Sequence, residues 1–181
     1  MTNSYAKPKL SVKTQTLATV GAVAAAVILP QLFHLIGAVS GLGTAPGETF
    51  LPMHLPIILA GLIAGPYVGA IAGVLSPLIS FALTGMPGVA MLPFMMIELC
   101  VYGLSSGLLR NVNLPTIVKV LIAQAAGRGV RAIAILIAAY AFGNTAVPVA
   151  VIWNSIVAGI FGIVLQWALI PLIVYRVEHK G

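Results

Sequence analysis

FLPMHLPIILAGLIAGPYVGAIAGVLSPLISFALTGMP, residues 50–87, is the stretch that decides the fold. It contains no Lys, Arg, Asp or Glu, yet it is rich in glycine and proline. A soluble core does not use so long an uncharged run, and a simple anchor does not need so many helix breakers, so we interpret it as two membrane-crossing helices. The first is expected to begin at Leu51 and the second to end near Thr84. Gly65-Pro66 predicts a tight turn between them, because proline lacks an N–H group and disfavours helix in the residue before it.

Small residues recur at every fourth position of this stretch. The glycines with this spacing are Gly61, Gly65, Gly69 and Gly73. Helices in lipid are held together by close packing, and small residues at this spacing let two helix backbones approach each other. Pro77, with Ser76 and Ser80 beside it, predicts a kink in the second helix. The stretch therefore predicts a packed bundle.

The composition of the whole chain agrees with this interpretation. Of 181 residues, 60% are hydrophobic and 7% are charged, and the mean hydropathy is +1.11, values unlike those of soluble domains. Since a crossing takes roughly 20 apolar residues, about 30 residues per helix and loop allow at most six crossings. The expected fold is an all-α membrane protein, a compact bundle of six transmembrane helices. This leaves no room for a soluble catalytic domain, and the sequence contains no phosphate-binding glycine loop with lysine.

The apolar runs place the remaining helices. Besides the two in the central stretch, we expect helices over roughly 14–37, 89–109, 115–142 and 147–175. A glycine-rich loop over 38–50 connects the first helix to the second. The expected organisation is a cytoplasmic tail, a six-helix transmembrane domain and a second cytoplasmic tail, with boundaries 1–13, 14–176 and 177–181.

The charge distribution predicts the orientation. If the N-terminus is inside, the inner segments contain Lys7, Lys9, Lys13, Arg110, Lys119, Arg176 and Lys180. The three outer loops then contain no Lys or Arg, so the positive-inside rule predicts that both termini are cytoplasmic in a multi-pass protein of the cell membrane. This bias explains the net charge of +6, and we expect no nucleic-acid partner. Cys100 is the single cysteine, so no intrachain disulfide is expected.

Three ionisable residues fall deep inside predicted helices, where such groups are costly and usually face the bundle interior. Glu98 is in the fourth helix, and Arg128 and Arg131 are in the fifth, on the same helix face as Gln124. At about 1.5 Å per residue from the inner ends, Glu98 lies at roughly 18 Å, Arg128 at about 21 Å and Arg131 at about 25 Å. We expect a buried Glu98–Arg128 pair that locks the two helices, with Arg131 left as a surplus charge for a ligand.

Other polar residues are expected at a similar outer depth. They are His34, Glu48, His54, Tyr102, Trp153 and Asn154. Each of them alone has an ordinary structural explanation, but their shared depth predicts an outward-facing pocket, because ligand sites combine apolar walls with a few convergent polar groups.

A second pattern lies on the first helix. Ala18, Ala22 and Ala26 recur at every fourth position, which indicates either packing within the bundle or a smooth face for docking another membrane protein. The spacing alone does not separate these alternatives.

These features resemble the substrate-binding subunit (S-component) of energy-coupling factor (ECF) vitamin transporters. The resemblance rests on the six helices, the alanine repeat and the segments LPMHLPIILAGLIAGP, GVLSPLISFALTGMP, IELCVYG and AGR (126–128). It implies that the chain binds a vitamin or vitamin precursor near the outer surface and works with a transmembrane coupling protein and two ATPase subunits. It also implies docking through Ala18, Ala22 and Ala26, and we expect no catalytic residue, metal or cofactor.

The substrate and two rival functions stay open at this stage. The resemblance points to a hydroxymethylpyrimidine or pyridoxine-type ring, with pantothenate as a close rival. Two arginines against Glu98 favour an anion, whereas Trp153 and Tyr102 favour a ring. A self-sufficient small transporter or a structural membrane subunit is the main alternative. An intramembrane hydrolase would need one of the serines of the central stretch with His54, and no nucleophile motif supports it.

Overall fold

The computed structural model describes residues 10–179, and the predicted tails therefore lie mostly outside the described residues, Lys7, Lys9 and Lys180 included. The described part is helical without strands, which confirms the all-α class. Its elements are α1 (Val12–Ser40), α2 (Ala45–Phe50), α3 (His54–Ala64), α4 (Pro66–Thr84), α5 (Leu92–Leu108), the 3-10 turn η1 (Leu109–Asn111), α6 (Thr116–Tyr140), α7 (Val151–Ala158) and α8 (Ile160–His179).

The predicted number of crossings is confirmed within the described residues. Six helical segments are long and apolar enough to span a bilayer, namely Val12–Ser40, Ala45–Ala64, Pro66–Thr84, Leu92–Asn111, Thr116–Tyr140 and Ile160–Val177. The outside of the bundle is apolar, with exposed side chains such as Leu35 and Phe161. Such a surface suits lipid, because helices satisfy their own backbone hydrogen bonds and expose only side chains.

Two predicted boundaries are wrong, and the first concerns the second crossing. The expected loop over 38–50 contains α2, and the crossing begins at Ala45 instead of Leu51. Leu51 caps the C-terminal end of α2, and its φ of 47° lies in the left-handed region. Pro52 explains this interruption, because the residue before a proline is disfavoured in the helical region. Regular helix resumes at His54.

The second wrong boundary concerns the last crossing, expected as one helix over 147–175. It is interrupted at Gly159, which separates α7 from α8. A side chain at Gly159 would collide with Leu51, and one at Gly162 would collide with the backbone of Phe50. The two helix interruptions therefore pack against each other, and glycine is needed where they touch.

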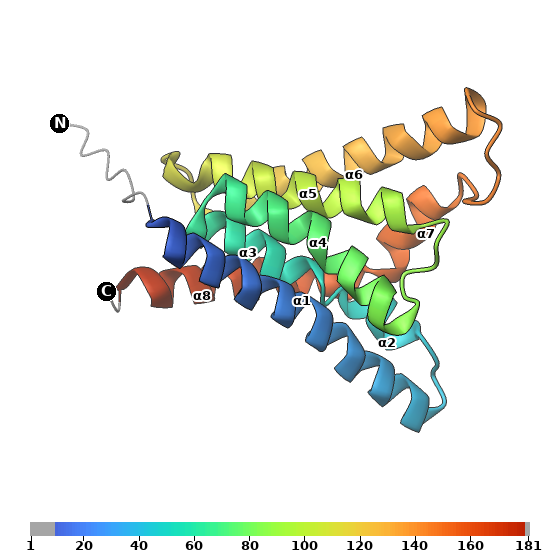
Figure 1. Ribbon diagram of the computed structural model, residues 1–181, viewed down its shortest axis with the longest axis horizontal. Helices are drawn as coiled ribbons and strands as arrows, with labels where there is room; N and C mark the ends of the chain where they lie inside the picture. The colour runs from blue at the N-terminus through green and yellow to red at the C-terminus, as the bar shows by residue number, and fades with distance from the viewer. Residues whose placement is uncertain (1–9, 180–181) are drawn as a thin grey trace.

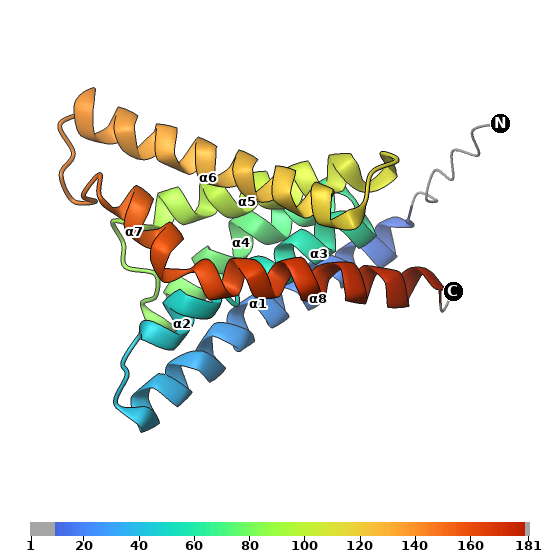
Figure 2. The same cartoon turned by 180° about the vertical axis from the view of Figure 1, so that it is seen from behind.

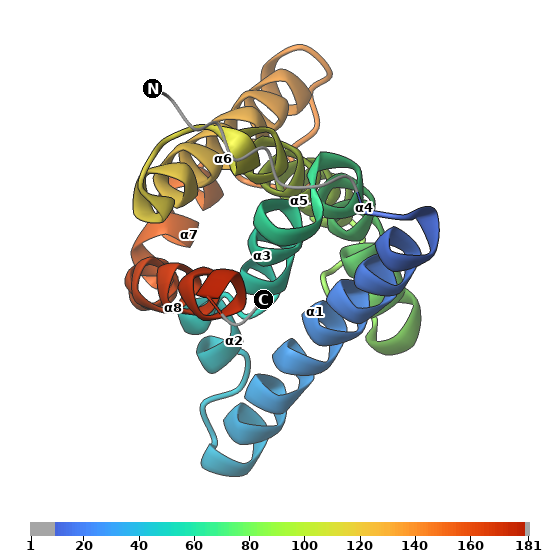
Figure 3. The same cartoon turned by 90° about the vertical axis from the view of Figure 1, so that its left-hand side faces the viewer.

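The glycine spacing produces the expected close packing. A Cβ atom at Gly69 would meet the backbone of Gly103, one at Gly73 would meet the backbone of Leu99, and one at Gly61 would meet the Ser106 side chain. α4 and α5 therefore touch backbone to backbone. α3 lies in the centre of the end-on view, with α1, α4, α5 and α8 packed around it (Figure 3).

The helices converge at one end and diverge at the other. α1 begins and α8 ends at the converged end (Figure 1). α1 and α6 splay apart towards the other end, where α2 and α7 lie (Figures 1 and 2). The bundle is therefore tightly packed in one half and open in the other.

Candidate functional site

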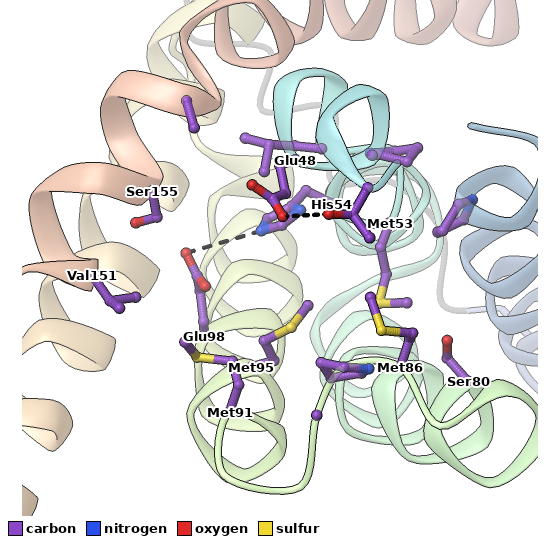
Figure 4. A pocket seen from close by; sticks show the side chains of 18 of the residues that line it. Glu48, Met53, His54, Ser80, Met86, Met91, Met95, Glu98, Val151 and Ser155 are labelled. Carbon is purple, nitrogen blue, oxygen red and sulfur yellow. Dashed lines mark hydrogen bonds and ion pairs between the residues drawn. The ribbon is translucent and has the colours of Figure 1, made fainter. Parts of the chain in front are cut away.

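A cavity of about 470 Å³ lies among the splayed ends of the helices. Its wall is contributed by α1 to α7, and Figure 4 shows part of it. The polar residues that line it are His34, Thr44, Glu48, His54, Ser80, Glu98, Arg131, Asn154 and Ser155. The volume is within the range of small-molecule sites, which reach from about 300 to 1,000 Å³.

The innermost charged groups of the cavity form a buried ion pair. A terminal nitrogen of Arg131 donates to Glu98 Oε2 at 2.7 Å, and the two side chains are 9% and 1% exposed. The Tyr102 hydroxyl donates to the other carboxylate oxygen, Oε1, at 3.0 Å. The second terminal nitrogen of Arg131 donates to the Ser155 hydroxyl on α7. The pair thus connects α5, α6 and α7, with both carboxylate oxygens of Glu98 and both terminal nitrogens of Arg131 in hydrogen bonds.

The predicted pairing of Glu98 with Arg128 is wrong, because Arg131 takes that place. The reason is the direction of helical side chains, which point towards the N-terminus of their own helix. α5 and α6 run in opposite directions, so Glu98 reaches towards the splayed end and Arg131 reaches back towards the converged end. Glu98 and Arg131 therefore meet although their Cα atoms differ in depth. Arg128, which precedes Arg131 on α6, is directed further towards the converged end than Glu98.

Arg128 is the charged residue left over. It does not line the cavity, and it is half-buried on α6. Its Nε and Nη1 atoms are buried without a hydrogen-bond partner among the described residues. The surplus positive charge in this bundle is therefore Arg128, outside the cavity wall.

His54 lines the cavity next to the ion pair. Its Nε2 atom lies 3.9 Å from Glu98 Oε1, and its ring centroid is 5.3 Å from that of Tyr102. The residue is 5% exposed, and its Nδ1 atom is buried without a hydrogen-bond partner among the described residues. An unsatisfied buried group costs about 1–3 kcal/mol, which a ligand or water at this position would recover.

Gln124 belongs to a separate polar network that stabilises the cavity rim. Its amide donates to Gln166 at 2.9 Å and accepts from the Trp167 indole at 2.7 Å. Gln166 in turn donates to the Leu51 carbonyl at 3.3 Å. The network connects α6 and α8 to the interruption between α2 and α3, so Gln124 acts on the cavity through its frame.

The structure brings together six of the ten predicted ligand-site residues in the cavity wall: His34, Glu48, His54, Glu98, Arg131 and Asn154. Tyr102 lies beneath the wall, where it supports Glu98. Trp153 is 71% exposed on the outside of α7 and does not line the cavity. Its neighbour Asn154 points the other way around the helix, which explains why only one of them reaches the site.

Sequence reasoning missed much of the apolar wall. Met53, Met86, Met91 and Met95 line the cavity, and Figure 4 shows their side chains gathered around one part of it. The chain has six methionines in all, and four of them line this wall. Three of these four lie within 86–96, and this local concentration is the signal that could have found them.

The alanine repeat of α1 packs against α3 and α4. Ala18 and Ala22 contact the cluster of Ala60, Ala64 and Val68, and Ala26 is fully buried. Packing within the bundle is therefore present in the isolated chain. Docking of a partner through these alanines stays a prediction.

The fold and the cavity together define the class of this protein. A six-helix membrane bundle with a mostly apolar cavity at one end, into which a few polar groups converge, is a membrane-embedded binding protein for a small molecule. In a comparison with known protein families, residues 15–174 match the family described as the ECF transporter, substrate-specific component. The chain therefore belongs to this family, as the resemblance in its motifs predicted. Comparisons with curated proteins and with solved structures found no match.

Family membership defines the general role. The chain is a substrate-specific membrane subunit of an ECF transporter, which associates with an energy-coupling module and a small-molecule substrate. Subunits of this kind bind substrate and are not ATPases, which supports a non-enzymatic role. Among the described residues, no group of three or more His, Cys, Asp or Glu side chains could hold a metal ion.

Proposed function

We propose that this chain captures a small water-soluble vitamin or vitamin precursor in the cavity at the splayed end. The observation that carries the proposal is the buried Glu98–Arg131 pair at the base of that cavity. Buried ions in a membrane helix usually mark a substrate path, and a structural lock alone would not need a cavity of about 470 Å³ beside it. The candidate ligands are a hydroxymethylpyrimidine or pyridoxine-type ring and pantothenate.

The experiment that tests this function is purification of the full chain in mild detergent, followed by native mass spectrometry of any retained small molecule. A vitamin-sized ligand that is released on unfolding, and that raises the melting temperature when added back, is the expected result. The Arg131→Ala variant should retain none. A retained ligand of unrelated chemistry, such as a lipid only, would contradict the proposal.

The partners implied by the family are a transmembrane coupling protein and two ATPase subunits. Uptake in cells that contain the chain but lack the coupling module should be absent. Robust uptake by the chain alone would favour the alternative of a self-sufficient transporter, and absence of any bound ligand would favour a structural subunit.

The docking surface on α1 is proposed to include Ala18, Ala22 and Ala26. Ala22 already contacts α3 and α4, so Ala22→Trp could also disturb packing within the bundle. Gly21→Trp is the control, because an added side chain there meets open space. If the alanine face docks the partner, Ala22→Trp loses co-purification with the coupling protein but keeps ligand binding. Loss of both would show that the alanines serve packing alone.

We propose that the cavity opens outward and that both termini are cytoplasmic. Support comes from Lys13, Arg110, Lys119 and Arg176, which belong to segments at the converged end. In a Cys100→Ser background, cysteines at Thr44 and Asn144 should react with an impermeant reagent in intact cells. A cysteine at Asn113 should react only after permeabilisation. The reverse pattern would overturn the orientation.

A further inference from the structure

Resting on the proposed function, we infer that the cavity takes an uncharged or cationic nitrogen heterocycle with N–H or O–H donors, and that it rejects carboxylates and phosphates. Three observations carry this inference: the pairing of the arginine in the wall with a carboxylate, the charge that remains among the lining residues, and the hydrogen-bonding groups left free. Each concerns residues that line the same cavity.

The positive charge of the arginine in the wall is already paired with a carboxylate, so an anionic ligand has to compete with Glu98 for it. One terminal nitrogen of Arg131 holds Glu98 at 2.7 Å, and the other donates to Ser155. A ligand carboxylate bound to Arg131 would either displace Glu98, which is 1% exposed and would then lie buried without its cation, or place a second negative charge beside it. Stranding a buried charge in this way is strongly unfavourable. Arg128 offers no substitute, because it does not line the cavity.

The charge that remains in the wall is negative. The charged residues lining the cavity, apart from histidine, are Glu48, Glu98 and Arg131, so two carboxylates face one guanidinium and the balance is −1 with neutral imidazoles. Glu98 is neutralised by Arg131, which leaves Glu48 on α2 as the uncompensated charge. Glu48 is exposed, and its carboxylate accepts a hydrogen bond from the Thr44 hydroxyl at 3.0 Å. A carboxylate in this position attracts cations and repels anions.

The free hydrogen-bonding group next to the ion pair is an acceptor. His54 Nε2 faces a carboxylate oxygen at 3.9 Å, so the favoured neutral tautomer carries its proton on Nε2. His54 Nδ1 then has a lone pair and, within residues 10–179, no partner. Together with the Glu48 carboxylate, this makes the wall rich in acceptors. A ligand that supplies N–H or O–H donors is complementary to it.

The methionine wall favours a flat ring as the ligand body. Met53, Met86, Met91 and Met95 line the cavity, and Met91 and Met95 lie beside Glu98 (Figure 4). Thioether side chains adapt their shape and make favourable contacts with aromatic rings. A ring heterocycle that bears donors on its edge would contact both the sulfur atoms and the acceptors.

The inference is tested with matched pairs of probes that differ in one charged group, titrated calorimetrically against the purified full chain. The pairs are pyridoxine with 4-pyridoxic acid, pyridoxine with its 5′-phosphate, panthenol with pantothenate, and 4-amino-5-hydroxymethyl-2-methylpyrimidine with its phosphate. In each pair that binds, the member without the anionic group should bind about tenfold more tightly or better. Equal or tighter binding of the carboxylate or phosphate member would overturn the inference while leaving the proposed function standing. Binding of no probe would contradict the proposed function and the inference with it.

Variants of Glu48 separate charge from shape. Glu48→Gln should weaken the preferred probe about tenfold and reduce its advantage over the anionic partner, because the uncompensated carboxylate is removed. Glu48→Asp keeps the charge and should keep the preference. If Glu48→Gln leaves the ratio between the paired probes unchanged, Glu48 does not set the charge selectivity and the inference fails in this part.

Discussion

The two halves of the bundle use the same helices in opposite ways. In the converged half, α4 and α5 touch backbone to backbone at Gly69 and Gly103. In the splayed half, Glu98 of α5 is joined to α6 by its side-chain ion pair with Arg131. Packing without side chains holds the helices in fixed positions, so their other ends can separate and enclose polar groups. The difference indicates that stability and binding are supplied by different halves, and the predictions below test this division.

The largest effect is expected from Gly103→Leu. Any side chain here collides with the backbone of Gly69, which cannot move aside. Adding methylene groups to a well-packed core costs about 1–3 kcal/mol, and a whole side chain driven against a backbone costs more than this, so we expect loss of the monodisperse folded protein. Size-exclusion chromatography and thermal melting measure this. Gly129→Leu is the matched control, because an added Cβ atom there meets nothing, and it should behave like the parent.

Arg131→Ala should have the next largest effect and should reduce both the stability of the fold and the affinity for the ligand. It leaves Glu98 buried without its cation, at a cost of about 3–5 kcal/mol. The melting temperature and ligand affinity should fall together. The double variant Glu98→Gln with Arg131→Gln removes both charges and should recover most of the stability without recovering binding. Normal affinity in the double variant would mean that the pair is a structural lock and that the ligand binds elsewhere in the cavity.

Arg128→Gln should have a much smaller effect, although Arg128 lies one helical turn from Arg131. Two of its guanidinium nitrogens have no hydrogen-bond partner among the described residues, and it is outside the cavity wall. We expect a stability change within about 1 kcal/mol, the contribution of a single hydrogen bond, and unchanged ligand affinity. Thermal melting and calorimetry on Arg128→Gln beside Arg131→Gln check the contrast. A loss of binding as severe as that of Arg131→Gln would place Arg128 in the ligand site.

The smallest effect on stability is expected from Met95→Leu in the cavity wall. The exchange conserves volume, so stability should stay close to that of the parent, while ligand affinity falls a few-fold because the sulfur contact is lost. Met96→Leu is the control, since Met96 is adjacent in sequence and does not line the cavity. Equal affinities for the two variants would show that the thioethers are not used in binding.

Much of this protein follows from its sequence because lipid leaves few choices. The length of apolar runs determines the crossings, and the spacing of Gly61, Gly69 and Gly73 determines where helices can touch. The scarcity of ionisable groups inside the spans identified Glu98 and Arg131 as residues of interest, and both line the cavity. These features depend on local composition and periodicity, which one chain displays directly.

The tertiary structure alone decided which charges meet and what surrounds them. Arg128 and Arg131 share a helix face, and only the antiparallel course of α5 and α6 selects Arg131 as the partner of Glu98. The methionine wall combines residues from the segment between α2 and α3, the segment before α5 and α5 itself, which no local pattern connects. The interruptions at Leu51 and Gly159 are likewise matched to each other across the bundle. A contact between distant segments depends on side-chain direction and backbone approach in three dimensions, and a linear spacing contains neither.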